Sequence, residues 1–368
     1  MYVLALAASV LGEPLKEARG LRAPFGCTGI INSLVSVSTA EGYNMIEIHG
    51  FTVPAGKKLV INAAPNAIIN LMGDLVFEAD ASFQTDGHLF MISGNGVTFN
   101  GNDYTIDGQG AKYWDGLGTA TNERRKPHPM ILLNFSGTFQ HVRVLNSPAH
   151  AFGVTNKATL TISHVTIDNS LGNLPNLLSG LKPAGHNTDG FNVLANDVTI
   201  KDSVVINQDD CIAIASGNNI NILRNKCVGG HGISIGSIIT GRAVSNVLIA
   251  GNYLVSSEQA LRIKTFAGAT RWGNNEGHSG ASGLASSSIK VIPQFSVRPE
   301  VASKSSFEPP QGVTFTGTNV ITVLPRAAMV EVNCVPGDCS GTWDWAGLKV
   351  YGGRIGTHMY SGIINFRQ

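Results

Sequence analysis

Three segments of the chain repeat one local pattern at one spacing. They read NTDGFNV (187–193), DDCIAI (209–214) and HGISI (231–235). In each, a polar residue stands two positions before a short apolar-x-apolar signature: Asp189, then Asp210, then His231. Asp189 and Asp210 are 21 residues apart, and Asp210 and His231 are again 21 apart. Equal spacing in equal contexts predicts a chain that winds repeatedly past the same place.

Short β-rich runs occupy the chain from about residue 90 to 265, separated by Gly, Asn, Asp and Ser. LTISHVTIDNS and VTIKDSVVINQDDCIAI are examples. Their alternating apolar positions indicate strands, and no helical period of comparable length accompanies them. Repeats of this kind favour an all-β parallel β-helix, in which each coil covers the core of its neighbour. An antiparallel sandwich or barrel also has short strands, but it does not explain why whole strand–turn–strand blocks superpose with their polar residues.

Residues at equivalent positions of successive coils should stack, because neighbouring strands of a sheet lie about 4.8 Å apart. HAFGV (150–154) shares the frame of the three repeated segments, and RIK (262–264) lies on the strand of the next coil. The polar residues predicted to gather on one face are His150, Asp189, Asp209, Asp210, His231, Gln259, Arg262 and Lys264.

Three carboxylates on neighbouring coils raise each other's pKa, because like charges repel at short distance. A protein selected for stability alone has no reason to place three acids so close together. Perturbed titrating groups are typical of functional sites. One suitable chemistry is glycoside hydrolysis, with a protonated carboxyl as acid and ionised carboxylates activating water. The other is a lyase in which the carboxylates hold Ca²⁺. Arg262 and Lys264, two positions apart on one strand, face the same way and would bind an anionic group such as a sugar carboxylate.

Net charge and the N-terminus bear on the cellular setting. The net charge of +1 gives no field that would draw the chain to nucleic acid or to an anionic membrane. The start, MYVLALAASVLG, resembles a weak signal peptide, so residues 1–26 are expected to be a signal and pro-segment. We therefore predict a secreted, extracellular protein.

The cysteines favour the same setting. Cys211/Cys227 and Cys334/Cys339 are disulfide candidates, which leaves Cys27 unpaired.

Four motifs in order, NTDGFNV, NQDDCIAI, GGHGISIGS and RIKT, resemble glycoside hydrolase family 28, the polygalacturonases of the secreted fungal or insect type. TVPAG (52–56), IDGQGAKYWDG (106–116) and GTWDWAGLKVYGG (341–353) are also similar to that family. The resemblance implies a right-handed parallel β-helix that hydrolyses α-1,4-linked galacturonan with inversion. It implies no cofactor and no bound metal, pectin as the partner, and a monomer.

Roles follow from the same resemblance, position by position. Asp209 matches the general acid, Asp189 and Asp210 match the pair that activates water, and His231 matches the histidine that tunes the acid. The positions implied to bind substrate are Arg262, Lys264 and Asn187. His150 shares the column and is a further candidate for substrate contact.

Two departures from the family pattern stand out. Asn192 occupies a position where the family commonly has Asp. Residues 271–310 break the coil rhythm and contain no tyrosine, although their length is close to that of relatives, which suggests a shifted reading frame. We predict one catalytic β-helix domain over 27–368 with 271–310 atypical. An endo-acting hydrolase is favoured, and an impaired pectin-binding homologue and a Ca²⁺-dependent pectate lyase remain alternatives.

Overall fold

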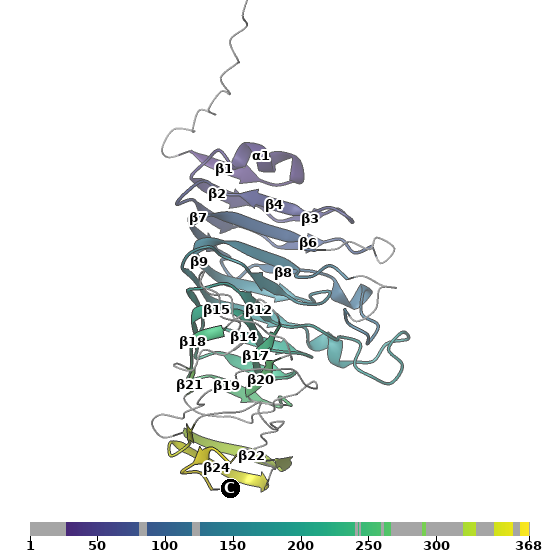
Figure 1. Cartoon of the computed structure of the whole chain (residues 1–368). Coiled ribbons are helices and arrows are strands. Elements are labelled where there is room, and N and C mark those ends of the chain that lie inside the picture. The colour runs from purple at the N-terminus through teal and green to yellow at the C-terminus, as the bar shows by residue number, and fades with distance from the viewer. Residues whose placement is uncertain are drawn as a thin grey trace, which may run out of the picture.

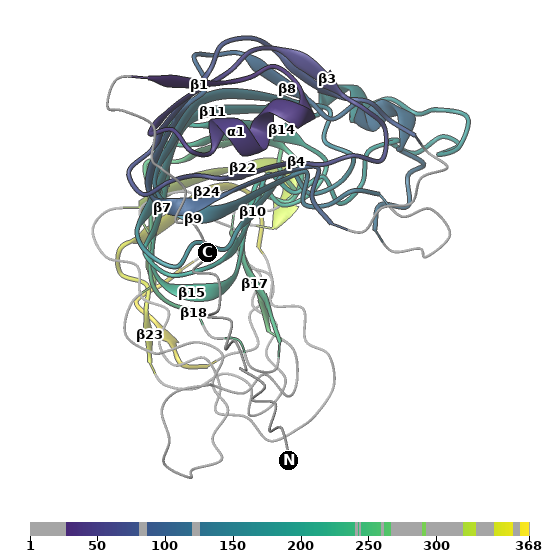
Figure 2. The ribbon, with the colours of Figure 1, turned by 90° about the horizontal axis from the view of Figure 1, so that it is seen from above.

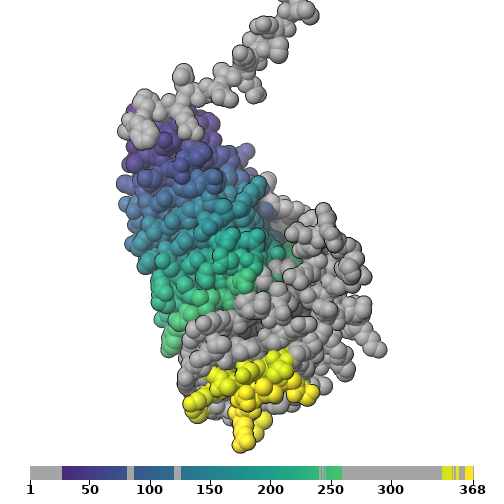
Figure 3. Space-filling view, turned by 60° about the vertical axis from the view of Figure 1, so that its left-hand side comes forward, coloured from purple at the N-terminus to yellow at the C-terminus, as the bar shows by residue number. Residues whose placement is uncertain are grey.

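The computed structural model describes residues 27–80, 87–119, 126–239, 242, 244–258, 261–265, 289–291, 319–328, 342–355 and 361–367. The strands of this part pair in parallel and run around a single axis, coil after coil, as a right-handed parallel β-helix (Figures 1 and 2). The predicted fold class is therefore confirmed. In Figure 3 the coils follow one another in chain order along a column that runs from purple to green.

Each coil contributes to three parallel sheets. The first, called the site sheet below, consists of β4 (Leu59–Asn62), β7 (Phe90–Asn100), β9 (Ile131–Leu145), β10 (Phe152–Val154), β12 (Phe191–Leu194), β15 (Ile212–Leu223), β17 (Ile233–Ile238) and β20 (Leu261–Thr265). The long strands β7, β9 and β15 bend at a corner and continue into the second sheet.

The second sheet adds β1 (Thr28–Ile31), β2 (Met45–Ile48), β5 (Ile68–Leu71), β11 (Leu160–Asp168), β13 (Val198–Lys201), β18 (Val244–Ala250) and β21 (Ile289–Val291). The third contains β3 (Phe51–Val53), β6 (Leu75–Phe77), β8 (Thr105–Asp107), β14 (Val204–Asn207), β16 (Lys226–Gly229) and β19 (Tyr253–Val255), together with the ends of β9 and β11. Two further parallel pairs join β22 (Asn319–Ala328) to β24 (Leu348–Arg354) and β23 (Trp343–Asp344) to β25 (Ile363–Ile364).

Alternation along each strand builds the core. Inward positions are mainly Ile, Val, Leu and Phe with almost no exposure, and the residues between them point outward and are more exposed. Phenylalanines from successive coils form a stack along the axis: ring centroids are 4.7 Å apart for the parallel pair Phe99–Phe139, 5.5 Å for the edge-to-face pair Phe139–Phe152 and 5.0 Å for the parallel pair Phe152–Phe191. Every coil thus buries its apolar face against the next, as a solenoid requires.

Helical segments are short and lie at the end or edges of the column. They are η1 (Leu34–Ser36), α1 (Val37–Ala40), η2 (Gly110–Lys112) and η3 (Ser170–Asn173). At the N-terminal end α1 lies on β1 (Figure 1), with Val37 and Ala40 buried. The approach is so close that a side chain at Gly29 would meet the carbonyl of Ala40 at 2.7 Å. The first coil is therefore covered rather than left as an open apolar end.

Cys211 and Cys227 form a disulfide with a Cα–Cα distance of 5.8 Å, which confirms that predicted pair. Both are fully buried, and the bond joins the coil of Asp210 to β16. Cys27 is an exposed free thiol. Cys334 and Cys339 lie outside the described residues.

Replacing both Cys211 and Cys227 with alanine is expected to lower the free energy of unfolding by about 3 kcal/mol, because the bond closes a short loop in the unfolded chain. Urea unfolding measures the change, with Cys27→Ser as the control that should leave stability unaltered. A double variant that unfolds at the wild-type urea concentration would show that the bond contributes nothing.

Most of the atypical segment 271–310 also lies outside the described residues. Within it, β21 pairs in register with β18, Val247 opposite Ile289. One piece of the segment thus continues the second sheet by one coil. The single domain over 27–368 stays a prediction.

Candidate active site

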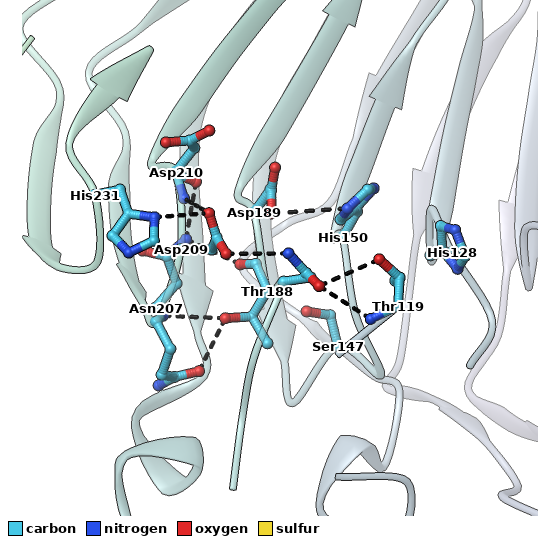
Figure 4. Close-up of polar contacts among 12 residues, drawn as sticks. Thr119, His128, Ser147, His150, Thr188, Asp189, Asn207, Asp209, Asp210 and His231 are labelled. Atoms are coloured by element: carbon cyan, nitrogen blue, oxygen red, sulfur yellow. Dashed lines mark hydrogen bonds and ion pairs between the residues drawn. The ribbon is translucent and has the colours of Figure 1, made fainter. Parts of the chain in front are cut away.

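Strand register places the repeated polar residues on successive rungs of the site sheet. Phe152 pairs with Phe191, Phe191 with Ile212, and Ile212 with Ile233. The residues two positions before these partners are His150, Asp189, Asp210 and His231. Figure 4 shows their side chains together along one face, with Asp209 between Asp189 and His231. The predicted ladder of these five residues is thus present in the structure.

Asp209 is the hub of the polar contacts. Its Oδ1 accepts hydrogen bonds from the Asp210 N–H (2.8 Å) and from His231 Nδ1 (3.0 Å), and its Oδ2 accepts one from Asn187 Nδ2 (3.2 Å). Burial by itself raises the pKa of Asp209. The hydrogen bond and charge of His231, with smaller help from the Asp210 N–H and His186, outweigh burial and lower that pKa to about 2. Asp209 is therefore ionised in the ligand-free protein.

The turn that carries His231 is built from glycine. Gly229, Gly230 and Gly232 all have positive φ. At Gly230, with φ +57°, a Cβ atom would overlap the carbonyl oxygen of Asp209. This close approach lets the His231 N–H donate to that same carbonyl at 2.9 Å and brings the imidazole to the carboxylate.

Asn187 is oriented by a neighbouring loop. Its Oδ1 accepts hydrogen bonds from the Thr119 N–H (3.0 Å) and from Thr119 Oγ1 (3.2 Å). A backbone N–H can only donate, so Oδ1 must face Thr119 and Nδ2 must face Asp209. Asn187 thus donates to the Asp209 carboxylate and favours its ionised form.

A buried ion pair lies beside the segment that contains Thr119. Lys126 Nζ donates to Asp115 Oδ1 at 2.8 Å and to the Gly118 carbonyl at 2.6 Å, and its side chain is almost fully buried. Sequence reasoning missed Thr119, Asp115 and Lys126. They lie far from Asn187 along the chain and belong to no repeated pattern, and Lys126 closes a basic run, RRK, that is typical of a surface.

The other two aspartates are also buried. Asp210 Oδ1 accepts a 2.5 Å hydrogen bond from Ser234 Oγ, one rung further along. Asp189 Oδ1 lies 3.7 Å from His150 Nε2, and the His150 ring contacts His128 edge to face at 5.0 Å. Burial, with a smaller contribution from His128, lowers the pKa of His150 to about 4, against an opposing effect of Asp209.

The pKa of His150 predicts a pH dependence of stability. The folded protein binds this proton more weakly than the unfolded chain, whose histidine titrates near 6.5. Stability is therefore full above about pH 6.5 and declines as the pH falls toward 4, by an amount on the order of 2 kcal/mol. The free energy of unfolding at pH 7 and pH 4.5 measures the decline. His150→Gln should flatten it, and an unchanged slope in that variant would contradict the assignment.

Arg262 and Lys264 lie on β20, where Arg262 pairs with Ser234 of β17. The backbone therefore places them on the rung after His231, as expected. The structure does not describe their side chains, so their role in binding a sugar carboxylate stays a prediction. Asn192 lies on β12 within the same sheet, and its Nδ2 has no hydrogen-bond partner among the described residues.

Ligand atoms of Asp209, Asp210 and His231 all lie within 4.8 Å of one another, a spacing that a cation could bridge. Oδ1 of Asp209 already accepts two hydrogen bonds, and Oδ1 of Asp210 accepts one. Protein donors therefore already engage both carboxylates, and we do not assign the cluster as a metal site.

Comparison with known proteins gives the family. The model of the glycosyl hydrolases family 28 matches residues 44–366. This chain belongs to that family. The family 28 chain is 36% identical to an endo-polygalacturonase of Sclerotinia sclerotiorum over 88% of its own length and 83% of the relative's. It is 33% identical to a polygalacturonase of Fusarium fujikuroi, over 90% of both chains.

A solved relative supports the fold of this family 28 chain. The structure is endopolygalacturonase I from Stereum purpureum in complex with two galacturonates. It superposes with a TM-score of 0.78 at 40% identity, covering 92% of this chain and 98% of that one. Among the described residues, no helix of this family 28 chain is long and apolar enough to span a bilayer.

Proposed function

We propose that this family 28 enzyme hydrolyses α-1,4-galacturonosyl linkages of polygalacturonan and pectin, acting within the chain. The observation that carries the proposal is the convergence of Asp189, Asp209, Asp210 and His231 on adjacent rungs. The relatives support it, since they include endo-polygalacturonases, and the solved relative binds galacturonate.

In this proposal Asp209 is the general acid. It is ionised in the free protein, so it must take up a proton when the substrate binds. A bound galacturonate carboxylate adds negative charge, which raises the pKa of Asp209. The 3.0 Å hydrogen bond from His231 Nδ1 is then the route by which the proton reaches the carboxyl. Asp209 passes a proton to the glycosidic oxygen as the bond to the anomeric carbon breaks.

Asp189 and Asp210 take the part of general base. As carboxylates they remove a proton from water, whose oxygen bonds to the anomeric carbon, so that one water is consumed for each linkage cleaved. Arg262 and Lys264 bind a sugar carboxylate, and Asn187 and His150 contact the sugar. Replacing each of these side chains with a neutral or shorter one, and measuring the rate at which reducing ends form, tests its role.

Inversion at the anomeric carbon is the stereochemical outcome proposed. Inverting enzymes usually hold their carboxyl groups about 6.5–9.5 Å apart, to leave room for water. One carboxylate oxygen of Asp209 and one of Asp210 lie within 4.8 Å of each other, below that range. We therefore propose that Asp189, on the rung before Asp210, is the member of the base pair that takes the proton from water. Proton NMR of the first products decides the point: inversion releases the β-anomer, and an initial α-anomer would reject it.

The test of the proposed activity is incubation with polygalacturonate. Hydrolysis raises the number of reducing ends and lowers viscosity early, as endo cleavage does. Unsaturated products whose formation stops when a chelator is added would identify a Ca²⁺-dependent lyase. Binding of polygalacturonate without new reducing ends would identify an impaired homologue.

We also propose that the enzyme acts outside the cell as a monomer, with residues 1–26 removed and 27–368 forming one domain. The buried disulfide between Cys211 and Cys227 favours an oxidising compartment.

A further inference from the structure

Glu258 approaches the imidazole of His231 at the nitrogen that Asp209 does not contact. His231 Nδ1 lies 3.0 Å from Asp209 Oδ1, and His231 Nε2 lies 3.4 Å from Glu258 Oε2. The Glu258 side chain is 68% exposed, whereas that of Asp209 is 9% exposed. His231 is therefore held between a buried and an exposed carboxylate.

The backbone explains why Glu258 occurs at this place. The turn before β20 stacks on the glycine turn before β17: the Glu258 N–H donates to the Gly230 carbonyl at 2.8 Å, and Ser257 Oγ donates to the Gly229 carbonyl at 2.7 Å. One rung earlier, the His231 N–H donates to the Asp209 carbonyl in the same manner. Asp209, His231 and Glu258 thus follow one another on three rungs.

Two flanking carboxylates select one protonation state of the ring. A neutral imidazole has a single N–H, so one of its nitrogens would turn a lone pair toward a carboxylate. An imidazolium has two N–H groups and satisfies both partners. Asp209 and Asp210 face His231 from the preceding rung and Glu258 from the following one. The side chains of Arg262 and Lys264, on the strand after Glu258, lie outside the described residues.

We propose that Glu258 is a positioning residue, which fixes the orientation of His231 and keeps its imidazole protonated for delivery of the proton to Asp209. The proposal rests on the proposed function, because that delivery matters only if Asp209 acts as an acid. In this role Glu258 acts through His231. It is the outermost of the three groups, and its effect is therefore sensitive to salt.

The main variant is Glu258→Gln, which keeps an oxygen that can accept from Nε2 and removes the charge. The matched control is Glu47→Gln. Glu47 forms a similar exposed pair with His49, at 3.3 Å, on β2 near the other end of the column. Both pairs lose one carboxylate, but only the first pair belongs to the proposed site.

The first measurement is the pH profile of kcat/KM on polygalacturonate. Glu258→Gln is expected to move the alkaline limb to lower pH by about half a unit at low ionic strength. The displacement should shrink in about 0.5 M salt, because exposed charges are screened. Glu47→Gln should superpose on the wild type. Coincident profiles for Glu258→Gln and the wild type would overturn the proposal.

The second measurement does not depend on turnover. NMR titration of the His231 imidazole should show a lower midpoint in Glu258→Gln than in the wild type, and an identical midpoint rejects the pairing. If the midpoint moves but wild-type protein releases no reducing ends, the pairing stands and the hydrolytic function fails. The two hypotheses are thereby separated.

Discussion

Asp209→Asn is expected to lower kcat on polygalacturonate by about 10³- to 10⁴-fold, the range typical of a lost general acid. The substituted amide retains an oxygen that can accept from the Asp210 N–H and from His231, so the turn should keep its shape. It carries no proton that the leaving oxygen can take at an accessible pH. KM should change little, because the sugar carboxylate is bound elsewhere. Initial rates from reducing ends and a circular dichroism spectrum measure the two effects.

Asp202→Asn is the matched control for this substitution. Asp202 pairs with Arg224 through two hydrogen bonds of 2.7 and 2.8 Å, on a turn between β13 and β14 rather than on the site sheet. Its pKa is lowered by that arginine hydrogen bond, so it is also an ionised aspartate in an ion pair. The control should keep wild-type kcat. Activity of Asp209→Asn within tenfold of the wild type would remove Asp209 from the mechanism.

Phe152→Ala is expected to lower the free energy of unfolding by about 3–5 kcal/mol, because it removes a fully buried aromatic ring and leaves a cavity. Phe152 lies in the axial stack between Phe139 and Phe191 and belongs to β10, the strand that follows His150. Loss of its ring disrupts the packing of two coils at once. Urea unfolding at neutral pH, followed by fluorescence, gives the change.

Leu177→Ala serves as the comparison for the core substitution. Leu177 is fully exposed on the loop after η3, so its truncation should alter stability by less than about 0.5 kcal/mol. Equal, small effects of the two substitutions would mean that the phenylalanine stack is not the core of the coil.

The spacing of 21 residues predicted the rungs of Asp189, Asp210 and His231, and together with the short alternating apolar runs it predicted the fold. One coil of this part of the helix has that length, so equal spacing translates directly into strand register. Asp189, Asp210 and His231 therefore fell on neighbouring rungs with the offset that the sequence indicates.

The repeat spacing could not predict the contacts that irregular segments between the strands make. Thr119 reaches Asn187 across 68 positions of sequence, and Lys126 is buried although its basic neighbours suggest a surface. Neither Thr119 nor Lys126 belongs to a repeating sequence pattern, so the sequence does not indicate these contacts. The ionised state of Asp209 was likewise hidden, because it depends on the hydrogen bonds from His231 and from the Asp210 N–H rather than on the number of acids nearby.

A crystal structure of Asp209→Asn with a galacturonate oligomer would decide whether the ladder is a catalytic site. The oligomer should cross the site sheet with a glycosidic oxygen within hydrogen-bonding distance of residue 209 and a water held by Asp189 or Asp210 beside the anomeric carbon. A sugar chain bound to another face, with these residues left in solvent, would contradict the assignment.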